Sequence, residues 1–165
     1  MRLAPIPPDQ LSEAQRGLDA SLRAGIKAHL HGFASERRDG ALIGPFVPML
    51  HHPQFGQKLW GFLAALMENS TLPKPAHEVV ILAVGARFRS RYELYAHEHV
   101  AARAGLSAAK IATVVAGERP ADLSEQEGIA YDVASSLGRG GPCPRRHTKR
   151  PSRFSGRRAW PNSST

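Results

Sequence analysis

The stretch from Glu78 to Gly105 constrains the fold most, because it reads as two consecutive helices joined by a short basic turn. An apolar run over 79–84 follows the carboxylate of Glu78, and beyond the turn apolar residues return at helical spacing. Glu93 and His97 stand four residues apart in the second helix, so their side chains lie on one helix face. This pattern is what a small buried acid–base site needs.

Capping signals and apolar spacing predict further helices on both sides of this stretch. Ser12 and Gln15 have the spacing of a capping box, and so do Ser124 and Glu127. A helix is also predicted over 53–69. The apolar residues on one side of that helix are Phe55, Leu59, Phe62, Leu63 and Leu66. We count about six helices and no convincing strand, which predicts an all-α domain.

The segment 32–53 interrupts this helical pattern with three glycines and three prolines. A long helix is improbable there. Its apolar residues, Phe46 among them, indicate a segment that packs over the core or lines a pocket.

The location of the charge argues against a nucleic-acid-binding domain. The net charge is +8, but residues 1–138 hold 14 basic and 14 acidic residues, which leaves them neutral. Residues 139–165 hold the remaining 8 basic residues (22 − 14 = 8) and none of the acidic ones. We therefore divide the chain into a domain at 1–138 and a basic tail at 139–165, which its composition predicts to be disordered.

Other bulk properties place the chain among cytoplasmic proteins. No apolar run approaches the roughly 20 residues that span a bilayer, and the N-terminus has no hydrophobic signal core. The single cysteine, Cys143, permits neither an internal disulfide nor a cysteine-based metal cluster. We expect a protein of the reducing cytoplasm that does not associate with a membrane.

Several elements, in order, give the chain a family resemblance. They are DGALIGPFVPMLHHP at 39–53, LPKPAHEVVILAVGA at 72–86 and YELYAHEHVAARAGLS at 92–107, with weaker agreement over 117–138. The chain resembles the carboxymuconolactone decarboxylase family, within the alkylhydroperoxidase D-like superfamily. The resemblance implies an all-α fold, chemistry without a cofactor, and a homo-oligomer, commonly a trimer or hexamer.

The chain lacks the two cysteines that the peroxidase branch of this superfamily requires. In the peroxidase branch a glutamate is followed by two cysteines and a histidine, at offsets of 12, 15 and 19, which from Glu78 fall on Ser90, Glu93 and His97. The glutamate and histidine are kept and both cysteines are absent. Peroxide reduction there requires a thiolate and a resolving thiol. A family-level peroxiredoxin label would therefore not describe this chain's activity.

The decarboxylase branch implies chemistry on a small carboxylated lactone or related organic acid. We expect His97 to be the general acid/base, because a histidine titrates near neutral pH. Glu93 is expected to orient its ring, and Glu78 to serve as a second acid/base or structural carboxylate. The candidate substrate-binding walls are Phe46, Tyr92 and Tyr95. No metal is expected.

Simpler interpretations remain open. In the first, Glu93 and His97 form a pair on the helix surface that stabilises the helix by only a few tenths of a kcal/mol. In the second, Glu78 only compensates the dipole of its helix. A metal site made of these three residues has plausible ligand types but is not implied by the resemblance. A non-catalytic small-molecule-binding module is the alternative function.

The tail also departs from the family, which continues with a segment of the type F-G-x-x-G-V-x-E-L. The codons for Ala159–Thr165, read two bases later, encode apolar, Ala, Glu/Gln/Lys and Leu/Phe residues in a compatible order. We interpret the tail as the product of a frameshift near 140–143. The alternative is a genuine basic tail that contacts nucleic acid or anionic lipid.

Overall fold

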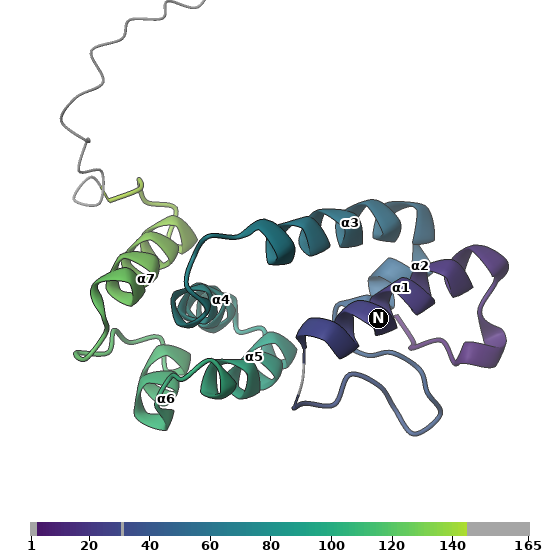
Figure 1. Ribbon diagram of the computed structural model, residues 1–165, viewed down its shortest axis with the longest axis horizontal. Coiled ribbons are helices and arrows are strands. Elements are labelled where there is room, and N and C mark those ends of the chain that lie inside the picture. The colour runs from purple at the N-terminus through teal and green to yellow at the C-terminus, as the bar shows by residue number, and fades with distance from the viewer. Residues whose placement is uncertain (1–2, 31, 145–165) are drawn as a thin grey trace, which may run out of the picture.

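The computed structural model describes residues 3–30 and 32–144, and within them it contains seven α-helices and no strand beyond one isolated bridge (Figure 1). The prediction of an all-α fold is confirmed. The helix that the sequence did not predict is the short α2, inside the Gly/Pro-broken segment. The helices are α1 (Glu13–His29), α2 (Phe46–His51), α3 (Pro53–Asn69), α4 (Lys74–Phe88), α5 (Arg91–Arg103), α6 (Ala108–Val115) and α7 (Glu125–Gly138).

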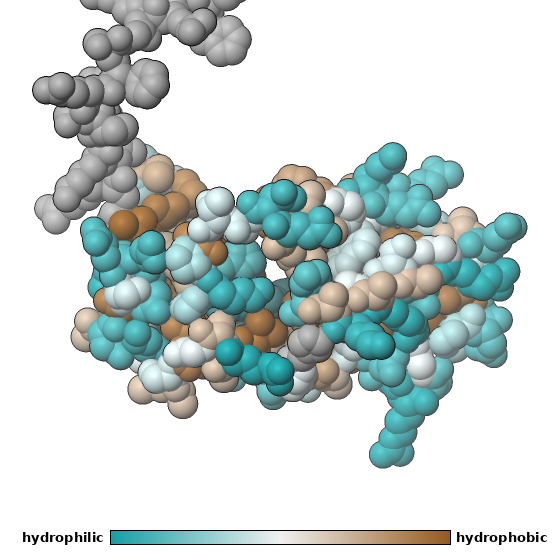
Figure 2. Space-filling view, in the orientation of Figure 1, coloured by the Kyte–Doolittle hydropathy of each residue, from teal (hydrophilic) through white to brown (hydrophobic). Residues whose placement is uncertain are grey.

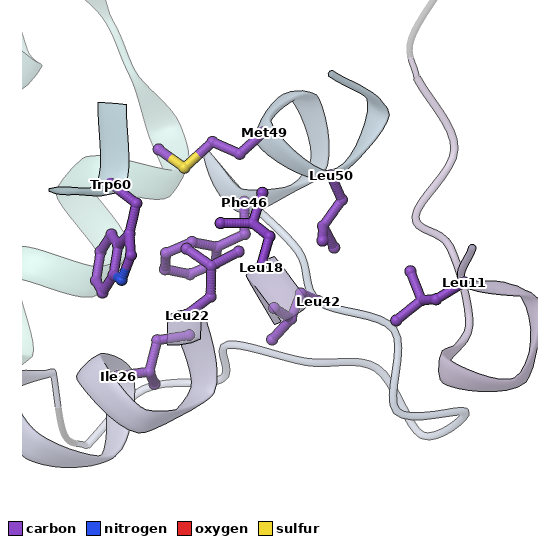
Figure 3. Close-up of a cluster of buried hydrophobic side chains, with 9 residues drawn as sticks. All are labelled: Leu11, Leu18, Leu22, Ile26, Leu42, Phe46, Met49, Leu50 and Trp60. Atoms are coloured by element: carbon purple, nitrogen blue, oxygen red, sulfur yellow. The ribbon is translucent and has the colours of Figure 1, made fainter. Parts of the chain in front are cut away.

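The N-terminal half packs α1, α2 and α3 around one hydrophobic cluster (Figure 3). Leu18 and Leu22 of α1 are completely buried. Phe46 of α2 meets Trp60 of α3 edge to face, with ring centroids 6.5 Å apart. Such aromatic pairs add stability beyond the area that they bury.

Both predicted capping boxes form and tie their helices to neighbours. At α1, Gln15 Oε1 accepts from the Ser12 amide at 2.8 Å, and Gln15 Nε2 donates to the Leu50 carbonyl of α2 at 2.9 Å. At α7, Glu127 Oε2 accepts from the Ser124 amide at 2.9 Å and from Lys110 Nζ of α6 at 3.0 Å. The residues that start these helices therefore also fix their packing.

Helix α3 has the predicted bounds, but its apolar residues divide between two environments. Leu59 and Leu63 pack against the N-terminal cluster. Phe55 and Phe62 are 66% and 62% exposed, and Leu66 is also exposed. The apolar face that the periodicity predicted for α3 is therefore only partly covered by other residues of the described chain.

The segment between α1 and α2 is held down by polar contacts rather than by its own secondary structure. Arg23 donates to Asp19, to Glu36 and to the Gly40 carbonyl. Glu36 and Leu42 form the isolated antiparallel bridge. These bonds satisfy backbone groups that a Gly/Pro-broken segment cannot satisfy by helix formation.

Helix α4 is central to the C-terminal half, in contact with α5, α6 and α7 (Figure 1). It is apolar nearly all round, which suits a helix covered on several sides. Val79 and Leu82 are completely buried in a second cluster. Arg89, in the left-handed region at φ 52°, turns the chain from α4 into α5, and Gly105 at φ 97° follows the end of α5.

No helix within the described residues has the length and apolarity that crossing a membrane requires. The basic tail predicted for 139–165 lies outside the described residues from 145 onward.

Two glycines of α3 give a matched stability test. A Cβ at Gly56 would lie 2.5 Å from the backbone carbonyl oxygen of Met49, whereas a Cβ at Gly61 meets nothing within 4 Å. Gly61→Ala should therefore raise the free energy of unfolding by about 0.5–1 kcal/mol, because alanine favours the helix. Gly56→Ala should lower it, since α3 must move away from α2. Urea denaturation of both variants measures this, and equal effects would contradict the packing described.

Candidate functional site

Glu78 is a carboxylate buried in the middle of the C-terminal half. It lies in the second turn of α4, beside the fully buried Val79, and is itself 1% exposed. An ionised carboxylate at such a depth is costly unless it is paired and hydrogen-bonded. The alternative that Glu78 compensates the helix dipole from the first turn is wrong, because the first turn of α4 contains no acidic residue.

The partner of Glu78 is His97 of α5. His97 Nδ1 lies 2.7 Å from Glu78 Oε2, and the imidazole side chain is 14% exposed. The turn between α4 and α5 folds the second helix back against the first, which brings together two residues that are 19 positions apart. One side chain from α4 and one from α5 thus meet in a single hydrogen bond.

Glu93 lies on the other side of the imidazole. Its Oε2 is 3.6 Å from His97 Nε2, which is an ion contact rather than a hydrogen bond, and its side chain is 36% exposed. The expected assignment of Glu93 as the orienting partner is therefore not what the geometry favours. Glu78 holds the ring, and Glu93 faces the nitrogen that remains available.

The surroundings of Glu78 stabilise its ionised form. Burial raises its pKa, but the side chains of His77 and His97, with the positive charges of His97 and Lys74, outweigh burial and lower the pKa to about 2. His77 Nδ1 is 3.7 Å from Glu78 Oε1 and Lys74 Nζ is 3.8 Å from it, and both distances exceed that of a short hydrogen bond. Only His97 makes a short contact.

This arrangement fixes which imidazole nitrogen can react. A carboxylate only accepts hydrogen bonds, so Nδ1 of His97 carries the proton shared with Glu78. Nε2 is then free to take up or deliver a proton on the side of Glu93. A histidine oriented by a carboxylate in this way is the usual form of a general acid/base.

The predicted aromatic walls do not line a cavity beside Glu93. Phe46 is 3% exposed and lies inside the N-terminal cluster (Figure 3). The Tyr92 hydroxyl donates to the Ala34 carbonyl at 3.1 Å, and the Ala34 amide donates to the Tyr95 hydroxyl at 3.0 Å. Phe33 contacts both tyrosine rings edge to face. These aromatics fasten the segment before α2 onto α5.

The environment of Tyr92 agrees with this anchoring role. Burial, helped by the negative charge of Glu93 and by Tyr95, raises the pKa of Tyr92 to about 12. A Cβ added at Gly44 would lie 2.2 Å from the Tyr92 ring, so the chain passes directly over it. The hydroxyl stays protonated at neutral pH and donates to backbone rather than to a substrate.

Sequence reasoning missed the cavity that does adjoin Glu93. It has a volume of about 430 Å³. Val80, Val84 and Phe88 of α4 supply an apolar wall, while Ser90 and Glu93 are its polar groups. The spacing of four between those α4 residues was a visible signal, but it was hidden in a helix that is apolar nearly all round.

Neither a thiol nor a cluster of metal ligands adjoins this pair within the described residues. Ser90 occupies the first cysteine position of the peroxidase pattern, and Cys143 is exposed beyond the end of α7. No group of three His, Cys, Asp or Glu side chains there is placed to hold a metal ion.

Comparison with known families assigns the chain to one of them. The model of the carboxymuconolactone decarboxylase family matches residues 53–136, about half of the chain. The chain belongs to the carboxymuconolactone decarboxylase family. The matched part runs from the start of α3 into α7 and so includes Glu78, Glu93 and His97. No curated protein and no solved structure matches this carboxymuconolactone decarboxylase family member closely enough to count as a relative.

The Glu78 carboxylate makes stability depend on pH in a defined window. Its pKa is about 2 in the folded protein against 4.5 ordinarily, so its stabilising effect is complete above about pH 4.5 and is lost as the pH falls toward 2. That difference corresponds to about 3 kcal/mol. Glu78→Gln should flatten the fall in the free energy of unfolding across this window, as measured by chemical denaturation at several pH values.

Glu118→Gln is the matched control, because it removes an exposed carboxylate that makes no described ion pair. Identical pH profiles for the two variants would show that Glu78 is not the buried charge that the structure indicates.

Proposed function

We propose that the protein is a decarboxylase-like enzyme that performs cofactor-free acid/base chemistry on a small carboxylated lactone or related organic acid. The observation that carries the proposal is the 2.7 Å contact between Glu78 and His97, with Nε2 of His97 3.6 Å from Glu93. Glu93 in turn lines the cavity, so it stands between the imidazole and the cavity's apolar wall. Membership of the carboxymuconolactone decarboxylase family supports the same class of chemistry.

His97 supplies the proton that this reaction requires. When the carbon–carboxylate bond breaks, carbon dioxide leaves and the bonding electron pair stays on the substrate, where a conjugated carbonyl can delocalise it. The imidazolium of His97 then protonates that carbon through Nε2, and solvent restores the proton to the ring. The contact of Glu78 with Nδ1 fixes the orientation of the ring.

The cavity sets the substrate class. Its wall along α4 is apolar, with Ser90 as a neutral hydrogen-bonding group and Glu93 at the polar end. A volume of about 430 Å³ suits a small ring compound rather than a polymer. In this proposal Glu93 positions water or substrate against Nε2, and Phe46, Tyr92 and Tyr95 have no part in binding.

The second candidate is a small-molecule-binding module without catalysis. The partial exposure of Glu93 and its long contact with His97 are compatible with a site that binds an acid and does nothing further. Thiol peroxidase activity is not proposed, because Ser90 and Glu93 stand where the two cysteines would be needed.

A comparison of His97 variants separates the two candidates. We expect turnover of carboxymuconolactone by the unaltered chain, and a fall of about 100-fold or more in His97→Ala, because general acid catalysis is lost. Cys143→Ser should retain full activity. Turnover that survives in His97→Ala would exclude His97 as the acid. Saturable binding of the lactone with no turnover in any of these proteins would favour the binding module.

We also propose that the frame of the gene slips near codons 140–143 and that the missing segment would cover an apolar groove. This groove, of about 740 Å³, lies between α4 and α7. Val84, Phe88 and Leu137 line it and are exposed, and Figure 2 shows apolar side chains gathered over the end of α7. A chain in the original frame would bury this surface and would assemble in the cytoplasm as a homo-oligomer, either trimer or hexamer.

Resequencing the gene from independent isolates should reveal an insertion or deletion near those codons. The repaired chain should then form a trimer or hexamer by light scattering, with a higher midpoint of thermal unfolding than the present chain, because apolar surface is removed from water. An intact reading frame in every isolate would refute the slip. Binding of the present chain to DNA that weakens with salt, and is lost on deleting 139–165, would support a genuine basic tail instead.

A further inference from the structure

A small cavity at the open end of the α4–α5 hairpin is surrounded by three basic side chains. His29 is the last residue of α1, Lys74 is the first of α4, and Arg103 is the last of α5. The cavity has a volume of about 170 Å³, and Val100 and Ala104 complete its lining. It shares no lining residue with the cavity beside Glu93. Segments far apart in the sequence thus place three basic groups around one cavity.

Of the three basic residues, Lys74 alone has an acidic partner among the residues that the structure describes. No acidic residue lines the cavity itself. His29 and Arg103 make no ion pair or hydrogen bond there. Lys74 Nζ lies 3.8 Å from Glu78, but that carboxylate is buried and its short contact is with His97. The residues 1–138 are neutral as a whole, so this cluster is a local concentration of charge.

Helix-end stabilisation explains only part of the cluster. His29 and Arg103 lie in the last turns of their helices, where a positive charge interacts favourably with the helix dipole. Lys74 lies at the opposite kind of end, the start of α4, where the dipole disfavours a cation. An anion in the cavity would reduce the repulsion between Lys74 and Arg103 and would interact favourably with the start of α4.

We propose that this cavity binds a compact oxyanion, either a phosphate group or a small carboxylate, through Arg103, Lys74 and His29. Arginine offers a planar pair of donors that matches such groups, and lysine adds a mobile point charge. The volume of about 170 Å³ holds an oxyanion with a few bridging waters. The site is independent of the proposed decarboxylation, although Lys74 links it electrostatically to Glu78.

Titration of the full chain with inorganic phosphate, at ionic strength held constant with chloride, tests the proposal. Two-dimensional NMR should show saturable shifts of the His29 ring and of the amides of Lys74, Arg103 and Ala104. Arg103→Met should weaken this binding by about tenfold, the effect of one charge-assisted hydrogen bond. The phosphate affinity of Arg103→Lys should fall between those of the unaltered chain and Arg103→Met, because lysine keeps the charge but loses the paired donors.

Lys58→Met is the matched control, because Lys58 is an exposed residue of α3 outside the cavity. It should bind phosphate as the unaltered chain does, and the basic tail is identical in every variant. A second titration with malonate distinguishes the two ligand types. Whichever anion binds more tightly, judged from the same NMR signals, shows whether the cavity prefers a phosphate group or a carboxylate. Shifts that rise linearly for both anions, or an affinity unchanged in Arg103→Met and Lys74→Met, would overturn the proposal.

Discussion

The hydrogen bond between Glu78 and His97 is the contact on which the C-terminal half depends. A carboxylate that is 1% exposed must be paired or must become neutral, and its pKa of about 2 shows that it stays ionised. The hairpin of α4 and α5 therefore has to place His97 opposite Glu78. Slippage by one residue would leave a charge unpaired in the core, at a cost of about 3–5 kcal/mol. The register of the hairpin and the geometry of the site have the same cause.

The two sides of α4 lie in different environments. One side, with Val79 and Leu82, is completely buried in the second cluster. The side with Val84 and Phe88 forms the wall of the cavity beside Glu93 and of the larger groove shared with α7. A helix that is apolar nearly all round can serve as a core element and as a cavity wall, because its neighbours decide which side stays uncovered.

Sequence reasoning was most successful where the physics is local. The capping boxes at Ser12 and Ser124 and the bounds of α3 depend on residues within one or two turns. It was least successful for the aromatic side chains. Tyr92 and Tyr95 carry polar groups that suit a binding site, but both hydroxyls bond to Ala34, some 58 to 61 residues away. Such long-range contacts leave no periodic signal.

By itself the sequence determined the all-α class and every helix except α2, and it singled out Glu78 and His97, because spacing and capping act over short distances along the chain. Only the tertiary structure decided their roles. Glu78 became the partner that orients His97, and Glu93 was left facing Nε2, because the packing of α4 against α5 sets which carboxylate reaches which nitrogen. Tertiary packing also created both proposed binding cavities, each from residues of more than one element.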